Sequence, residues 1–395
     1  MPGAAAEEPG ATNPVPSLLL MVREWGRIGC IGFGGPPTHI KLLRELCVER
    51  RRWLEPVEFE DAIATCNLLP GPASTQLSIF CAWRVRGRLG AVVGGLAFIL
   101  PGLLVILLLA ALFLSGAPPR WITAAGAGAG AAVAAVAVQA AASLMPASWN
   151  RARRASRLRW AGYLVAGGLA AATIGAWLVF VLLASGAIEL VRRSPRLRTS
   201  RPGTLSLPAI AGVGMTSGVL VSVVWVGLKV GALSYGGGFV IIPLMQGDAV
   251  NHYRWMTDAQ FLNAVVLGQI TPGPVVQTVA VVGYAAAGVV GGLLASAVAF
   301  TPSFAFILLG ARHFDRLRSN DEVRAFLDGA GPAAIGAILG SAVPLALALG
   351  EAWQFAVLAG AAALLFAFRR GVVLTLLAAA AAGVVLAAAG VAIPG

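Results

Sequence analysis

The chain has 395 residues, of which 58% are hydrophobic and only 12% are charged, and its formal net charge is +12. A soluble domain carries about a quarter charged residues, so this composition excludes a protein whose surface mostly faces water. The basic residues form short clusters between apolar runs, as in the cytoplasmic loops of membrane proteins, and do not form a nucleic-acid footprint. We expect a multi-pass protein of the cytoplasmic membrane, surrounded by the lipid bilayer and without a nucleic-acid partner.

In chain order, residues 1–16 contain two glutamates and no Lys or Arg, so they lack the basic region of a signal peptide and are interpreted as a disordered tail. Residues 17–33 carry three charges. We expect this segment to span the membrane with those charges facing the protein interior, the alternative being a position in the interface. Apolar runs of about 20 residues, long enough to cross a bilayer, then follow: 91–114, 121–145, 160–190, 207–237, 325–349 and 371–393.

The second half of the chain repeats the first at an offset of 202 residues. This offset aligns Phe33-Gly34-Gly35 with Tyr235-Gly236-Gly237. It also aligns Pro70-Gly71-Pro72 with Pro272-Gly273-Pro274, without a gap. Two motifs that keep the same register over this distance indicate a duplication.

The loop charges of the two copies are opposite. Residues 83–88 carry three arginines, whereas their counterpart 285–290 has no charge; residues 115–120 are nearly neutral, whereas their counterpart 312–324 holds four arginines. Because basic loops stay in the cytoplasm, this exchange predicts that one copy is inverted in the membrane.

The same reasoning predicts a topology. Residues 41–52 and 84–88 are both basic, so the segment 59–83 between them enters and leaves on one side, as a re-entrant hairpin with Pro-Gly-Pro at its tip. Residues 160–190 lie between two basic stretches and are expected to cross twice. The predicted fold is an all-α polytopic membrane protein of two inverted-topology repeats, each with about five spanning helices and one re-entrant hairpin. The repeats are 17–191 and 207–395, joined by a basic cytoplasmic linker at 192–206.

The glycine and proline motifs are where helices are predicted to break. Non-helical backbone inside a bilayer is tolerated only where it is buried in protein or lines a wet cavity, and inverted-repeat transporters bind substrate at such breaks. After each Pro-Gly-Pro a helix should begin, with unpaired N–H groups at residues 73–75 and 275–277 that favour anions.

Side chains near the breaks suit an oxyanion, because neutral donors occupy matched positions and Arg27 aligns with Lys229 without a matched acidic pair. The candidate substrate-binding residues are Arg27, Gly34, Gly35, Asn67, Pro70, Gly71, Pro72, Ser74, Thr75, Gln76, Lys229, Gly236, Gly237, Gln269, Thr271, Pro272, Gly273, Pro274, Gln277 and Thr278.

Simpler interpretations stay open: glycines that permit close packing, a plain proline kink, and cations that reach the membrane interface. His39 aligns with Ile241 and is interpreted as a loop or interface residue. The four cysteines are interpreted as structural. Motifs for hydrolysis, ATP binding or zinc are lacking, so we expect no catalytic residue, metal or cofactor.

At these residues the chain resembles the chromate ion transporter family in its two-domain form. The resemblance rests on Phe33-Gly34-Gly35-Pro36 followed by His39-Ile40, on Asn67 before the first Pro-Gly-Pro, and on the run 269–274. It covers nearly the whole chain, with one departure at Pro37-Thr38. The resemblance implies export of chromate, with uptake or exchange of sulfate-like anions discussed for relatives.

We therefore expect a secondary transporter that exports chromate and confers chromate resistance, and not an enzyme. A membrane potential of 100 mV, negative inside, favours outward movement by about 2.3 kcal/mol per charge. The alternatives are an importer or exchanger of sulfate or another oxyanion, a channel, and an intramembrane enzyme acting on lipid phosphates. A homodimer is a further open expectation.

Overall fold

The computed structural model describes residues 16–67, 69–114, 118–152, 156–173, 178–193, 218–234, 240–314, 316 and 320–394. Within these ranges every regular element is a helix, as the composition predicts. The expected tail, most of the expected linker, Gly236 and Gly237 lie outside the described residues.

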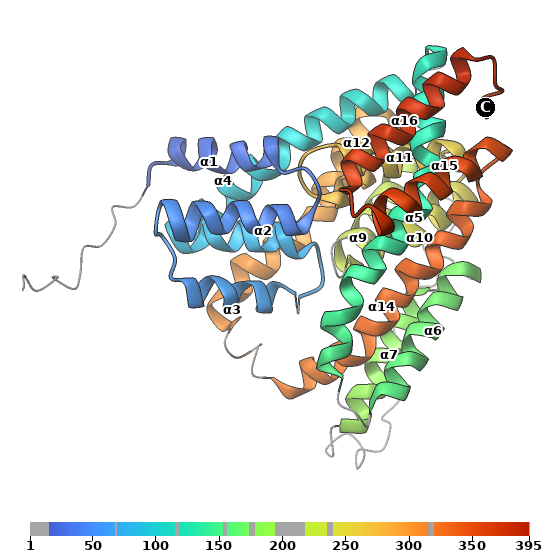
Figure 1. Cartoon of the computed structure of the whole chain (residues 1–395). Helices are drawn as coiled ribbons and strands as arrows, with labels where there is room; N and C mark the ends of the chain where they lie inside the picture. The colour runs from blue at the N-terminus through green and yellow to red at the C-terminus, as the bar shows by residue number, and fades with distance from the viewer. Residues whose placement is uncertain are drawn as a thin grey trace, which may run out of the picture.

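The first half contains eight helical elements in its described part (Figure 1). Their bounds are α1 Leu18–Ile31, α2 Pro36–Arg44, η1 Glu45–Arg50, α3 Pro56–Cys66, α4 Ala73–Phe113, α5 Arg120–Arg151, α6 Arg157–Thr173 and α7 Leu178–Arg193. As predicted, residues 160–190 form two helices, α6 and α7, and not one long one.

The described part of the second half follows the same order. Its elements are α9 Val219–Leu233, α10 Ile241–Gln246, η4 Gly247–His252, α11 Asp258–Ile270, η5 Val275–Gln277, α12 Thr278–Gly310, η6 Ala311–His313, α14 Asp321–Leu347, α15 Ala352–Ala362, η7 Ala363–Ala367 and α16 Val372–Ala388.

Local backbone details repeat together with the sequence. The π-helical turns η1 and η4 occupy equivalent positions, and each is followed by an arginine with positive φ, 50° at Arg52 and 54° at Arg254. The long helices α4 and α12 are each bent at a glycine in the left-handed region, Gly87 and Gly288, both with φ of 61°. The two halves therefore share a fold as well as a sequence pattern.

One of the two segments that the sequence presented as basic loops is largely helical: residues 41–50 form the end of α2 and all of η1. Residues 83–88, by contrast, contain the bend of α4, where Arg86 and Gly87 leave helical geometry. The chain folds back there, so that a Cβ on Gly94 would lie 2.5 Å from that of Ala82. Arg84, just before the bend, pairs with Glu58 of α3.

The structure is that of a multi-pass membrane protein. Among the described residues, four helices are long and apolar enough to cross a bilayer: Ala73–Phe113, Arg120–Asn150, Val275–His313 and Asp321–Leu347. Shorter apolar helices cover Val219–Leu233, Ala352–Ala367 and Val372–Ala388. The inverted orientation, the re-entrant hairpins and the five spans per half stay predictions.

The halves interlock through their long helices. Helix α14 of the second half packs against α6 and α7 of the first, and α5 of the first half packs against α15 and α16 of the second (Figure 1). Glycines bring these helices close: a Cβ on Gly336 would overlap the carbonyl of Leu164, and one on Gly383 would overlap that of Ala124. Such small-residue contacts hold membrane helices together where lipid offers no hydrophobic driving force.

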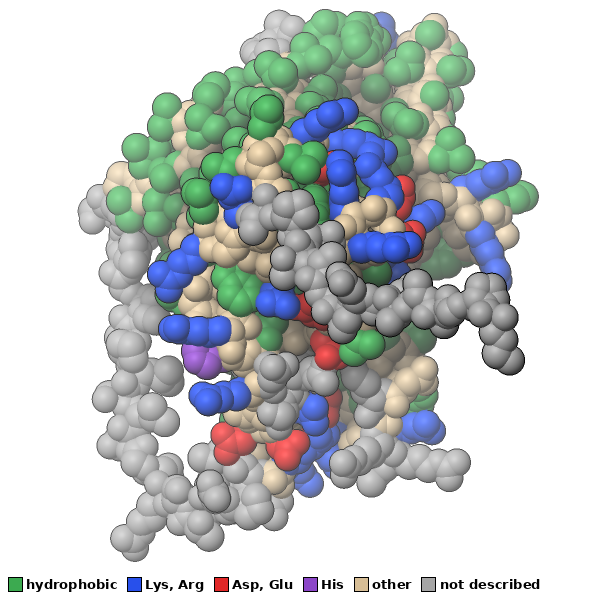
Figure 2. Space-filling model, turned by 90° about the vertical axis from the view of Figure 1, so that its left-hand side faces the viewer, with side chains coloured by type: hydrophobic (Ala, Val, Ile, Leu, Met, Phe, Trp, Pro, Cys, Tyr) green, Lys and Arg blue, Asp and Glu red, His purple; other side chains and the backbone are tan. Residues whose placement is uncertain are grey.

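Charge is unevenly distributed over the surface. On the face shown in Figure 2, hydrophobic side chains cover the upper part, whereas Lys and Arg side chains gather across the middle and lower parts. This separation is what a protein that meets both lipid and water requires.

Candidate functional site

Each Pro-Gly-Pro break is hydrogen-bonded to the other half of the chain. The backbone N–H of Gly71 donates to the carbonyl oxygen of Ser234 at 2.8 Å, and the N–H of Gly273 donates to the carbonyl oxygen of Gly32 at 3.1 Å. Gly32 and Ser234 are the residues at which α1 and α9 end. Each break is thereby joined to the end of a helix from the other half.

Glycine is required at the tips of both breaks. Gly71 has a φ of 117° and Gly273 a φ of 96°, a region that side chains with a Cβ rarely occupy. The flanking prolines cannot donate, and the second of each pair, Pro72 or Pro274, caps the helical segment that follows. The motif thus ends one helix and starts the next, as the sequence predicts.

The first turn after each break is tighter than expected. The N–H of Thr75 donates to the carbonyl of Pro72 at 2.9 Å, and the N–H of Gln277 donates to that of Pro274 at 2.9 Å. The expectation that these two N–H groups are unpaired is therefore wrong, because a 3₁₀-type bond closes each turn. An anion at this position would therefore depend on side chains more than the sequence suggested.

Buried polar atoms without a hydrogen-bond partner gather on the segments that flank the breaks. Such an atom costs about 1–3 kcal/mol of folding free energy, so a cluster of them needs an explanation. In the described part of the chain these atoms are Thr75 Oγ1, Gln76 Oε1, Ser78 Oγ, Ser234 Oγ, Asn263 Oδ1, Gln269 Nε2, Gln277 Oε1 and Ser303 Oγ. Four of these residues were among the predicted site residues.

Each half has one glutamine in the first turns after its break, Gln76 and Gln277, although the offset of 202 residues aligns Gln76 with Thr278 and Thr75 with Gln277. Gln76 Nε2 donates to the carbonyl of Pro70 at 2.7 Å, and Gln277 Nε2 donates to that of Ile99 at 2.7 Å, which leaves each side-chain oxygen unbonded. A Cβ built on Gly71 would lie 2.5 Å from Gln76 Nε2 and 3.1 Å from Ser303 Oγ. Side chains from both halves therefore line the first break.

Other predicted residues are placed differently. Thr271 and Thr278 are buried, but their hydroxyls donate to the carbonyls of Leu267 and Val275. Gly35, Pro72, Pro272 and Pro274 are buried beside the breaks, whereas Gly34, Asn67 and Pro70 are exposed.

The two aligned cations do not share an environment. Arg27 is exposed on α1. Lys229 is half-buried and donates to both carboxylate oxygens of Asp248, at 2.8 and 2.6 Å, with Trp225 beside it at 5.6 Å. The charge of Lys229 is thus balanced by the protein itself, and a role in substrate binding stays a prediction for both residues.

His39 is a member of the site that the sequence analysis placed elsewhere. It is buried in α2, where Nε2 contacts the carbonyl of Gly32 at 2.9 Å and Nδ1 contacts Ser74 Oγ at 3.1 Å. Its ring meets the edge of Phe98 at 5.0 Å. The interpretation of His39 as a loop or interface residue is wrong. Its spacing of four residues from buried Leu43, on a helix that begins at Pro36, was the available signal.

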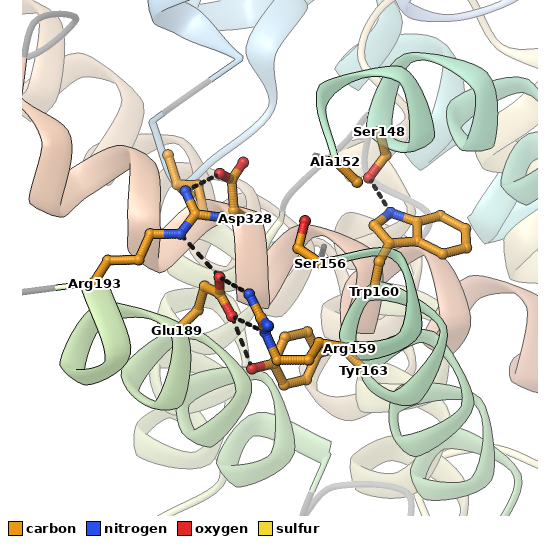
Figure 3. A pocket seen from close by; sticks show the side chains of 10 residues that line it. Ser148, Ala152, Ser156, Arg159, Trp160, Tyr163, Glu189, Arg193 and Asp328 are labelled. Atoms are coloured by element: carbon orange, nitrogen blue, oxygen red, sulfur yellow. Dashed lines mark hydrogen bonds and ion pairs between the residues drawn. The ribbon is translucent and has the colours of Figure 1, made fainter. Parts of the chain in front are cut away.

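A polar pocket separate from the breaks lies where α5, α6, α7 and α14 come together (Figure 3). Glu189 accepts bonds from Arg159 at 3.1 Å, from Arg193 at 2.9 Å and from Tyr163 at 3.2 Å, and Arg193 also binds Asp328 at 2.7 Å. Two arginines face two carboxylates, so this pocket offers no excess positive charge. It was not visible in the sequence because its lining residues come from four helices, of which α14 lies far along the chain from the other three.

A model of the chromate transporter family matches residues 19–190 and 221–384, which are the two halves described above. The chain belongs to the chromate transporter family. It is 32% identical over 348 residues to a chromate transport protein of Cupriavidus metallidurans, covering 85% of this chain and 84% of the relative. It is 30% identical over 357 residues to the chromate transport protein of Pseudomonas aeruginosa, covering 86% and 84%. No solved structure matches the chain.

Proposed function

We propose that this member of the chromate transporter family exports chromate across the cytoplasmic membrane as a secondary transporter, and that the anion binds where the two Pro-Gly-Pro breaks meet. One observation carries the proposal: the reciprocal hydrogen bonds Gly71–Ser234 and Gly273–Gly32 tie each break to a helix end of the other half, and unpartnered buried polar atoms lie on the segments that flank the breaks.

The donor set suits a tetrahedral dianion. Hydroxyls of Thr75, Ser234 and Ser303 and the amide of Gln269 can each donate a hydrogen bond, and none of them has a partner. The oxygens of Gln76 and Gln277 accept, and suit water molecules that accompany a partly hydrated anion. Neutral donors bind a dianion without the tight hold of a buried cation, and this permits its release on the other side.

The helix ends add to this effect. Helix α4 begins at Ala73 and the matching turn η5 begins at Val275, so both halves direct a helix N-terminus to the breaks. Helix N-termini carry partial positive charge and stabilise anions. In inverted-repeat transporters such half-helices bind substrate while one repeat moves against the other.

Direction follows from the charge of the substrate. A cytoplasm that is negative by 100 mV favours outward movement of a dianion by about 4.6 kcal/mol, so export needs no ATP. Expression in a sensitive bacterium should accordingly raise the chromate concentration that the cells tolerate and lower their chromate content.

Flux into proteoliposomes tests the proposal. With purified protein and a potential set by potassium and valinomycin, labelled chromate should accumulate on the positive side and stop accumulating when the potential is collapsed. Gly162→Ala provides a matched control, since Gly162 lies exposed on α6 with open space around its Cβ position. Flux no greater than in protein-free vesicles would refute chromate transport.

A second candidate is an importer or exchanger of sulfate or a related oxyanion. It is favoured by the same donor set, because hydroxyls and amides do not distinguish tetrahedral dianions of similar size. A competition series of sulfate and molybdate against labelled chromate, with each anion tested on either side of the membrane, separates exchange from net export.

A further inference from the structure

The carbonyl oxygen of Gly32 accepts two hydrogen bonds at the centre of the site. One comes from the N–H of Gly273 at 3.1 Å and the other from His39 Nε2 at 2.9 Å. A carbonyl can only accept, so Nε2 of His39 carries the ring proton.

This tautomer determines the state of Ser74. In the neutral ring Nδ1 has a lone pair and no hydrogen, so the Ser74 hydroxyl at 3.1 Å must donate to it. A serine has one hydroxyl hydrogen. Ser74 therefore presents only lone pairs to the break, although it lies in the first turn of α4 where an anion is expected.

We propose that His39 takes up one proton at Nδ1 when the oxyanion binds, and that the Ser74 hydroxyl then turns from His39 to donate to the anion. The inference rests on the proposed oxyanion site. The proton comes from water on the side from which the anion enters. Ser74 keeps its own hydrogen: its O–H turns to the anion, and its oxygen accepts a hydrogen bond from the new Nδ1–H of His39. Each dianion thus crosses with one proton and one net negative charge.

No charged side chain of the described residues is among the contacts of the His39 ring, so the bound anion is what stabilises its protonated form. The charged side chains on α2 and on the elements packed against it mostly form ion pairs with one another. Glu24 of α1 binds Arg50 and Arg51. Arg44 of α2 binds Glu49 and Glu60, and Arg84 of α4 binds Glu58. Arg86 donates to the carbonyl of Pro16, and Glu45 of η1 is half-buried. The further exposed cations on or beside these elements are Arg23, Arg27, Lys41, Arg52 and Arg88. The contacts of the His39 ring are Gly32, Ser74 and Phe98, none of which is charged. Burial disfavours an imidazolium, and a bound dianion beside Ser74 compensates for it.

The second half has no equivalent device. Ile241 stands at the position of His39, and Val276 at that of Ser74. The duplication therefore supplies two helix N-termini but a single proton site, which predicts one proton for each anion and not two.

Proton uptake on binding tests the inference. Full-length protein in lipid nanodiscs is titrated with chromate, and separately with sulfate, in two buffers of different ionisation enthalpy at several pH values. Wild type should take up close to one more proton per anion than His39→Gln, and its affinity relative to that variant should rise by up to about tenfold per unit of decreasing pH. Titration of chromate itself is common to both proteins and cancels in the comparison.

Glutamine is the matched replacement because its amide can donate to Gly32 and accept from Ser74 but cannot be protonated. Ser74→Ala should bind the anion more weakly at low pH than wild type, with a smaller difference at high pH. Equal proton uptake by wild type and His39→Gln would overturn the inference. If His39→Gln does not fold, wild type decides alone: sulfate binding without proton uptake at every pH overturns it. Binding of neither anion by wild type would instead refute the proposed function.

Discussion

Gly71 and Ser234 lie in different halves of the chain, and the N–H of one donates to the carbonyl of the other at 2.8 Å. The duplication repeats the bond in reverse between Gly273 and Gly32. Each break is therefore bonded in part by the other half, in addition to bonds within its own repeat such as that from Gln76 Nε2 to the carbonyl of Pro70. Movement of one half against the other would alter both bonds, so the proposed substrate site lies at the interface between the halves.

Substitution of Gly71 should damage the site strongly. Gly71→Ala imposes a φ of 117° on a residue with a Cβ and places that Cβ 2.5 Å from Gln76 Nε2. We expect a loss of about 1–3 kcal/mol of stability and of most chromate flux. Gly273→Ala shares the strained backbone but its nearest neighbour would lie at 3.4 Å, so its effect should be smaller. Thermal unfolding in detergent and vesicle flux measure both, and equal tolerance of the two substitutions would contradict the geometry.

Thr75 should show a conflict between stability and transport. Its buried hydroxyl has no partner, so Thr75→Val removes an unsatisfied group at constant shape. The variant should gain about 1 kcal/mol of stability and lose chromate affinity. In Thr375→Val, by contrast, a buried hydroxyl that donates to Gly371 is lost, so stability should fall while transport is kept. Undiminished chromate binding by Thr75→Val would show that the Thr75 hydroxyl does not bind the anion.

Lys229 and Asp248 should behave as one unit. Lys229→Gln leaves the buried Asp248 carboxylate without its cation, which costs about 3–5 kcal/mol. The double variant with Asp248→Asn should recover much of that loss, and chromate flux with it, because the pair is neutral as a whole. Arg27→Gln, at an exposed position, should change stability by less than about 0.5 kcal/mol. A stable double variant without flux would show instead that the Lys229 charge meets the anion.

The pocket in Figure 3 predicts a graded loss of stability. Glu189 holds Arg159 and Arg193 and is nearly fully buried, whereas Asp328 binds Arg193 alone and is 33% exposed. Glu189→Gln should therefore lower the unfolding temperature clearly more than Asp328→Asn. Because Asp328 belongs to α14 and Arg193 to α7, Asp328→Asn reports on contact between the halves, whereas Glu189→Gln breaks bonds within the first half. The reverse order would mean that the exposed pair is the stronger one.

The sequence by itself determined the membrane class, the duplication and the positions of the breaks. Composition settles the first, and the others depend on glycine and proline, whose constraints act within a few residues. The end of α1 at Ile31, the start of α2 at Pro36 and the start of α4 at Ala73 all follow from such local rules. The neutral donors near the breaks could also be identified from the sequence, because they lie within a few residues of the Pro-Gly-Pro motifs.

Only the tertiary structure decided what those local features contact. The bond from Gly71 to Ser234, the pairing of Lys229 with Asp248 and the burial of His39 beside Ser74 each depend on how helices pack, and a one-dimensional pattern does not encode that packing. Alignment of Arg27 with Lys229 suggested a shared role, yet one is exposed and the other is paired, because the residue facing Lys229 is an aspartate and its counterpart in the first half is Leu46. Backbone breaks are local properties of the chain, whereas the partner of a buried charge is a property of the whole fold.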